Sequence, residues 1–195
     1  MFTPDNGRAL RYNPQMIPWT PQLQKTLLKV VFPLVVIACV FVVARLRRLS
    51  WREDLGLIRP PAGESALWIA VYVAWMLLTD RLIGWRGPWD FTVWVQSPLI
   101  VNVLRVLAVS FLGPIGEELT FRGFLYGRLA RTRLGVVGTI VVLAAAWAAI
   151  HTDYSLPVVL VIFVSGLLLG VARYRTGSVL LPIAMHVVWN LYAVW

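Results

Sequence analysis

Long apolar runs joined by short polar connections dominate this chain of 195 residues. Hydrophobic residues make up 59% of it and charged residues only 14%, so it is far more apolar than a soluble domain of its size. A helix that crosses a membrane needs about 20 mostly apolar residues and satisfies its backbone polar groups internally. We therefore expect an all-α fold, a polytopic membrane bundle of six to eight transmembrane helices.

The apolar runs give the expected limits of these helices. Gly113, Pro114 and Gly116 separate the third run from the fourth, because glycine and proline usually interrupt helices. The connections are too short to hold a second core, so we expect a single membrane domain over residues 1–195, with a polar N-terminal segment over 1–25. Residues 45–65 are rich in arginine and are expected to form a surface loop or an interfacial helix. The candidate spans are residues 30–44, 66–79, 98–112, 117–130, 134–150, 154–172 and 177–195.

The basic charges of the chain are explained by lipid and do not indicate a nucleic-acid partner. The formal charge is +9, but the arginines lie between apolar runs and form no basic face. Cations in loops beside anionic lipid account for them. Alternating seven spans from a cytoplasmic N-terminus puts eleven loop cations, Arg173 among them, on the cytoplasmic side and five on the other. We therefore expect a multi-pass protein of the bacterial inner membrane, with its N-terminus inside.

Scarce ionisable side chains gather in three short motifs of the C-terminal half. From Val95 onward the only acidic residues are Glu117, Glu118 and Asp153, and both histidines of the chain lie in this half. A charge at the middle of a bilayer costs roughly 3 kcal/mol, so such side chains are expected to face the bundle interior and to be functional. The motifs are GEELTFRGF with Glu117, Glu118 and Arg122, WAAIH with Trp147 and His151, and HVVWN with His186 and Asn190.

Each motif puts two side chains on one helix face, because residues four apart are neighbours there. Glu118 can pair with Arg122, which leaves Glu117 as the freer carboxylate. Taken singly, the motifs also fit structural roles: an ion pair at a helix entrance, an interfacial histidine, or a hydrogen-bond clasp between helices. Taken together, they supply what amide hydrolysis requires. A carboxylate and an imidazole can deprotonate water, and donors from another helix can hold the oxyanion.

The order Glu-Glu-x-x-x-Arg, aromatic-x-x-x-His and His-x-x-x-Asn resembles the CPBP family of intramembrane glutamic endopeptidases, also called the CAAX protease and bacteriocin-processing family. The stretch from residue 172 to 186 is similar to the usual lead-in to the last motif of that family. The likeness covers about residues 113–192. The second motif commonly begins with phenylalanine, and here Trp147 stands in that place.

The resemblance implies a catalytic core over residues 113–195, with no cofactor. Glu117 would activate the attacking water with His151, Glu118 and Arg122 would orient the site, and His186 with Asn190 would form the oxyanion hole. The substrate would be a membrane-anchored peptide or protein, cleaved near its C-terminus. Relatives trim prenylated tails, process bacteriocins or remove C-terminal sorting tails, and a prenylated substrate suits this chain least.

Three other interpretations stay open. Glu117, His151 and His186 could bind zinc in a metal-dependent form of the same protease, although no His-Glu-x-x-His helix is present and asparagine is a poor zinc ligand. The clusters could instead clamp the helices of a non-enzymatic immunity or partner protein. They could also relay protons in a transporter. The sequence assigns no role to Arg105 or Asp153, and no oligomeric state.

Overall fold

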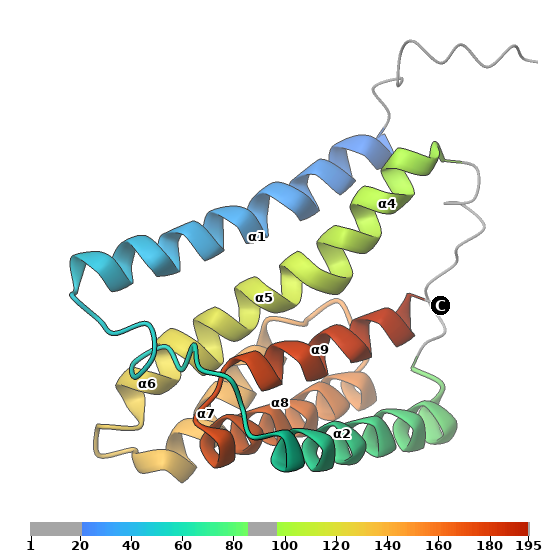
Figure 1. The fold of residues 1–195 in the computed structure, drawn as a ribbon. Helices are drawn as coiled ribbons and strands as arrows, with labels where there is room; N and C mark the ends of the chain where they lie inside the picture. Colours follow the sequence, from blue (N-terminus) through green and yellow to red (C-terminus); the bar gives the residue numbers. More distant parts are fainter. Residues whose placement is uncertain (1–20, 86–96, 195) are drawn as a thin grey trace, which may run out of the picture.

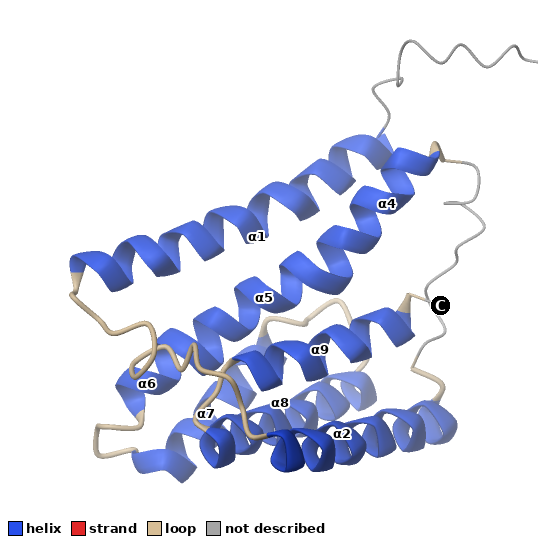
Figure 2. Ribbon diagram, viewed as in Figure 1, coloured by secondary structure: helices blue, strands red, loops and turns tan. Residues whose placement is uncertain are grey.

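The computed structural model describes residues 21–85 and 97–194, and the predictions for residues 1–20 and for residue 195 lie outside that part. Every regular element among the described residues is a helix (Figure 2). Four helices are long and apolar enough to cross a membrane, and two more are shorter. The prediction of an all-α membrane bundle is confirmed. The helices are α1 (Pro21–Leu46), α2 (Ala62–Ile83), a long helix over Leu99–Leu129, α7 (Gly135–Ala149), α8 (Leu156–Thr176) and α9 (Leu180–Ala193).

The long helix corrects one prediction from the sequence. Residues 98–112 and 117–130 were expected to be separate helices, but Gly113 and Pro114 lie inside one continuous helix. Its register changes just before the proline, where the N–H of Gly113 donates to the carbonyl of Ala108. This wider π-helical turn accommodates a residue that cannot donate a helical hydrogen bond. The helix consists of α4 (Leu99–Leu107), η1 (Ala108–Leu112), α5 (Gly113–Glu118), η2 (Leu119–Leu125) and α6 (Tyr126–Leu129).

The helices surround α9, which packs against α2, α5 and α8 (Figure 1). On the other side of the long helix, α1 runs beside it in the same direction (Figure 1). The two helices are in contact at Gly116, where an added Cβ would make only an ordinary contact, 3.5 Å from the carbonyl oxygen of Pro33. Because α9 packs against α5, the helix that carries the third motif lies beside the helix that carries the first.

Successive helices run in opposite directions, so their ends collect at two ends of the bundle. At one end Arg175 pairs with Glu64 at 3.2 Å, which joins the end of α8 to the start of α2. At the other end the hydroxyl of Tyr192 donates to Asp80 at 2.7 Å, which joins the end of α9 to the end of α2. Residues 47–61 form turns and loop at the first of these ends, as the expectation of a surface loop for residues 45–65 requires.

Candidate active site

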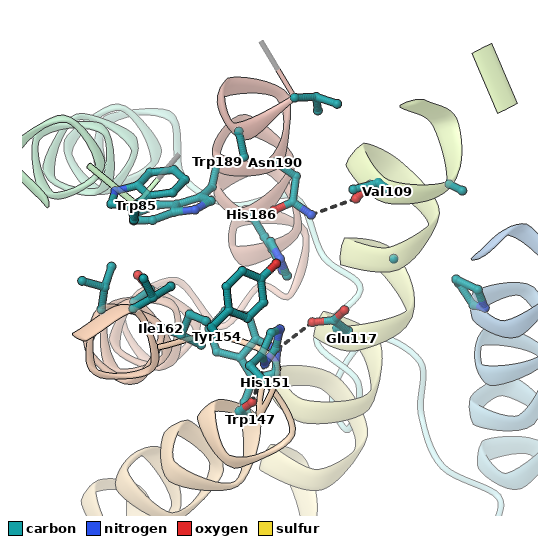
Figure 3. Close-up of a pocket in the computed structure, with 18 of the residues that line it drawn as sticks. Trp85, Val109, Glu117, Trp147, His151, Tyr154, Ile162, His186, Trp189 and Asn190 are labelled. Atoms are coloured by element: carbon teal, nitrogen blue, oxygen red, sulfur yellow. Dashed lines mark hydrogen bonds between the residues drawn. The ribbon is translucent and has the colours of Figure 1, made fainter. Parts of the chain in front are cut away.

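A cavity of about 300 Å³ lies among α1, α2, the long helix, α7, α8 and α9. It lies toward the end of the bundle where α2 and α9 finish, because Trp85, Ala193 and Val194 line it, and side chains from all three motifs also line it (Figure 3). Four of the six predicted site residues lie on its wall. The lining includes Glu117, Trp147, His151, Tyr154, Ser165, His186, Trp189 and Asn190.

Glu117 projects from the long helix into this cavity and is held by the second motif. The indole Nε1–H of Trp147 donates to Oε2 of Glu117 at 2.6 Å (Figure 3). Trp147 is buried, whereas Glu117 is only partly buried. One carboxylate oxygen is therefore fixed by a donor in the wall, and the side chain borders the open space.

His151 lies just beyond the end of α7, and its tautomer follows from its contact. Its Nδ1 is 2.8 Å from the carbonyl oxygen of Trp147. Since a carbonyl only accepts, Nδ1 carries the proton, and Nε2 of the neutral ring keeps its lone pair. The imidazole ring also packs edge-on against the indole of Trp147, with centroids 5.2 Å apart. The ring thus has a fixed orientation and one basic nitrogen.

Glu118 is the centre of a buried charged cluster. Nη1 of Arg122 donates to its Oε1 at 3.0 Å, and Nδ1 of His186 lies 3.0 Å from the same oxygen. Glu118 is 0% exposed and Arg122 is 1% exposed, so the cluster is shielded from lipid and water. Nη2 of Arg122 also donates to the carbonyl of Gly166 on α8 at 3.1 Å. The ion pair expected from the spacing of residues 118 and 122 is present, inside the bundle.

Asn190 binds the backbone of the long helix. Its Nδ2 donates to the carbonyl oxygen of Val109 at 2.8 Å (Figure 3). That carbonyl is available because the N–H of Gly113 is bonded to Ala108 and Pro114 has no N–H. An amide nitrogen has two donors, so one N–H of Asn190 remains for a ligand in the cavity.

Sequence reasoning missed Tyr154, which lines the cavity beside His151 with ring centroids 6.1 Å apart. Burial raises the pKa of the Tyr154 phenol, and the charges of Asp153 and Glu117 raise it further. The phenol therefore stays protonated near neutral pH and can donate a hydrogen bond. Asp153 itself is exposed in the turn after His151. The sequence signal that could have identified Tyr154 is a tyrosine three residues after a histidine at the end of a helix.

Arg173 was expected to be a loop cation, and that prediction is wrong. It is buried in the last turns of α8, where its Nε donates to the carbonyl of Arg122 at 2.9 Å. Its guanidinium also lies over the ring of Tyr126, 5.1 Å from the centroid. It supports the helix segment that carries the charged cluster. Arg105, another buried arginine, lies on α4.

Both histidines of the site are held through Nδ1, which is directed at a carbonyl in His151 and at a carboxylate in His186. Trp147 donates to one oxygen of Glu117. Within the described residues, no group of three or more His, Cys, Asp or Glu side chains is arranged to hold a metal ion.

Comparison with known proteins finds a family that is similar to the part of the chain that carries the motifs. The family model described as type II CAAX prenyl endopeptidase Rce1-like matches residues 99–192. This part of the chain is similar to the Rce1-like family. The match begins at the first residue of the long helix and ends near the end of α9, so it contains the whole set of motifs.

A curated relative extends the similarity over more of the chain. An uncharacterised 24.3 kDa protein of Escherichia coli is 28% identical over 165 residues, which cover 78% of this chain and 72% of the relative. No solved structure matches. The Rce1-like assignment therefore rests on the family model and on the motifs, and the relative adds no activity.

Proposed function

We propose that this protein is an intramembrane glutamic endopeptidase, in which Glu117 and His151 activate the water that hydrolyses a peptide bond. The observation that carries the proposal is the shared cavity, whose wall contains Glu117, His151, His186 and Asn190 from three different helical segments. A clamp between helices would need these groups to satisfy one another. Instead, Glu117 and His151 each border open space.

In the proposed reaction, water in the cavity attacks the carbonyl carbon of the scissile amide. Trp147 holds one oxygen of Glu117, and the other takes the proton of the attacking water. Nε2 of His151 has the lone pair needed to orient that water. When the C–N bond breaks, the proton passes to the departing nitrogen. The products are a carboxylate and an amine, and the glutamate is restored.

His186 and Asn190 are the proposed donors to the oxyanion of the tetrahedral intermediate. The free N–H of Asn190 can donate directly, because only one is used by Val109. Nε2 of His186 donates when the ring is doubly protonated, and the carboxylate of Glu118 is the counter-ion for that form. Arg122 and Glu118 act as positioning residues, since neither lines the cavity.

The proposed substrate is a membrane-anchored peptide or protein cleaved near its membrane-proximal C-terminus. The cavity lies within a bundle whose long helices can cross a membrane, so a segment that reaches it must lie at the membrane. Aromatic side chains in the cavity wall, including the stacked Trp85 and Trp189 with centroids 4.7 Å apart, suit apolar residues next to the scissile bond.

The test is quantitative mass spectrometry of protein C-termini in cells that carry the wild type or Glu117→Ala. We expect a set of longer C-termini to persist only with the variant. Glu53→Gln, which alters an exposed carboxylate in the loop at the other end of the bundle, should leave the C-termini as in the wild type.

Identical C-termini in wild-type and Glu117→Ala cells, with both proteins folded and equally abundant, would support the non-enzymatic interpretation. Cleavage that stops when a strong chelator is added to the purified protein would support the zinc-dependent interpretation. A proton-linked flux in sealed vesicles without any cleaved product would support the transporter.

A further inference from the structure

Most of the exposed arginines among the described residues lie at one end of the bundle. This arginine end consists of the loop at residues 47–61, the turn at 130–134, the turn at 177–179 and the helix ends beside them. Its loops are in contact, because Arg131 pairs with Asp54 at 2.7 Å. Nine of its arginines are exposed: Arg45, Arg47, Arg48, Arg52, Arg59, Arg128, Arg131, Arg133 and Arg175.

The opposite end, toward which the cavity lies, has fewer exposed cations among the described residues. Among the described residues, the exposed cations there are Lys25, Lys29 and Arg81. Arg8, Arg11 and Arg86 belong to segments that the structure does not describe. If all three are counted with this cavity end, it has six cations against the nine exposed arginines of the other.

The expectation of a cytoplasmic N-terminus came from seven spans, which put residues 45–59 and 128–133 on opposite sides of the membrane. The Arg131–Asp54 ion pair excludes that arrangement, since it joins these two loops. With the fourth predicted span merged into the third, both loops are at the arginine end. The side with more cations is therefore the arginine end, and α1 begins at the opposite end.

We infer that the arginine end is cytoplasmic, that the cavity opens to the non-cytoplasmic side, and that the substrate is a polypeptide segment presented from that side. Lysine and arginine in short loops favour the cytoplasmic side of a membrane, where the lipid surface is also more anionic. The acidic residues at the arginine end do not reverse this preference, because acidic side chains contribute little to orientation.

The part of the inference that concerns the substrate rests on the proposed function. Glu117, His151 and Asn190 face a cavity that Trp85 and Val194 also line, and these last two residues lie just beyond the ends of α2 and α9. A tail in the cytoplasm would have to enter the bundle from the arginine end to reach Glu117. The accessible substrates are therefore segments of exported or outward-facing membrane proteins, and a cytoplasmic prenylated tail is not among them.

Cysteine labelling tests the orientation without reference to activity. Cys39 is the chain's only cysteine, so a Cys39→Ala background can receive Thr152→Cys at the cavity end or Thr132→Cys at the arginine end. Both threonines are exposed in turns. With a membrane-impermeant maleimide on bacterial spheroplasts, we expect label on position 152 before permeabilisation and on position 132 only afterwards.

The reverse pattern, or label on both positions in sealed spheroplasts, would overturn the inferred orientation and leave the proposed protease intact. If either variant fails to fold, alkaline phosphatase fused after residue 195 replaces it. The fusion should be active, because α9 ends at the cavity end, and an inactive but full-length fusion would contradict the inference.

The substrate part has its own outcome. The C-termini that lengthen in Glu117→Ala cells should belong to segments outside the cytoplasm. Only cytoplasmic C-termini among them would overturn the inferred substrate class, and no lengthened C-termini at all would overturn the proposed function while the labelling result stands.

Discussion

Trp147 contacts four of the predicted site residues. Its indole N–H binds Glu117, and its carbonyl binds His151. Its ring lies 4.7 Å from the guanidinium carbon of Arg122 and 5.3 Å from the ring of His186. A phenylalanine, common at this place in the family that the sequence resembles, would preserve the ring but not the N–H.

Trp147→Phe should therefore lower kcat more than it raises KM, because Glu117 loses the donor that orients it. A hydrogen bond to a charged group contributes about 1.5–3 kcal/mol, so the expected loss is about tenfold to a hundredfold. Trp68→Phe is the matched control, since its indole also donates to a glutamate, Glu64, at 3.2 Å, and neither residue lines the cavity. Equal rates for Trp147→Phe and the wild type would remove Trp147 from the proposed mechanism.

Arg122→Ala should destabilise the folded protein by about 3–5 kcal/mol, because it leaves the buried carboxylate of Glu118 without its ion-pair partner. Arg131→Ala breaks an ion pair whose arginine is 63% exposed, and it should cost no more than about 1 kcal/mol. Denaturant unfolding in detergent, followed by tryptophan fluorescence, measures both. Similar losses of stability in the two variants would show that the buried cluster is not a structural centre.

At the scale of the helix, the long segment over Leu99–Leu129 combines anchoring and chemistry. Its π-helical turn at η1 leaves the Val109 carbonyl to Asn190, while η2 contains Arg122. A regular α-helix would use the Val109 carbonyl for its own N–H. The π-helical turn thus allows Asn190 of α9 to bond to the helix that carries the first motif.

Pro114→Ala should disturb this connection, since the new N–H at residue 114 can donate to the Val109 carbonyl and compete with Asn190. We expect lower kcat with little loss of stability, because alanine favours the helix. Pro157→Ala, in the first turn of α8, is the control and should leave kcat unchanged. An unchanged rate for Pro114→Ala would mean that the Asn190 contact does not affect the reaction.

The close packing of α7 on α8 depends on small residues. A Cβ added at Gly166 would lie 3.0 Å from Ala144 and 3.2 Å from Nη2 of Arg122. Gly166→Ala should therefore both destabilise the bundle, by about 1–3 kcal/mol, and move Arg122. Gly138→Ala on α7 meets only ordinary contacts, of 3.5 Å or more, and should be neutral or slightly stabilising. Thermal unfolding in detergent distinguishes them, and equal melting temperatures would contradict the packing argument.

Local spacing was enough to predict part of the site. The Glu118–Arg122 pair needs only the geometry of one helix, and the cost of charge in lipid requires it to face inward. Arg173 could not be predicted in this way, because its hydrogen bond to Arg122 and its contact with the ring of Tyr126 come from another helix. Pro114 was misinterpreted because a soluble helix would break there, whereas a membrane helix can absorb the proline in a wider turn.

For the whole molecule, the number of passes decides which side of the membrane the site faces. Hydropathy alone predicted seven spans, and one unbroken helix in place of two changes the side assigned to every later loop. The inferred orientation rests on a contact between loops, Arg131 with Asp54, that no local pattern reveals.

The measurement that tests the central claim most directly is the cleavage rate of purified protein in nanodiscs, with a substrate identified from the C-termini. General base catalysis contributes about a hundredfold to ten-thousandfold, so Glu117→Gln should lower kcat by at least about a hundredfold while the melting temperature stays near that of the wild type. The Glu53→Gln variant should cleave the same substrate at the wild-type rate. A folded Glu117→Gln protein that cleaves at the wild-type rate would contradict the account.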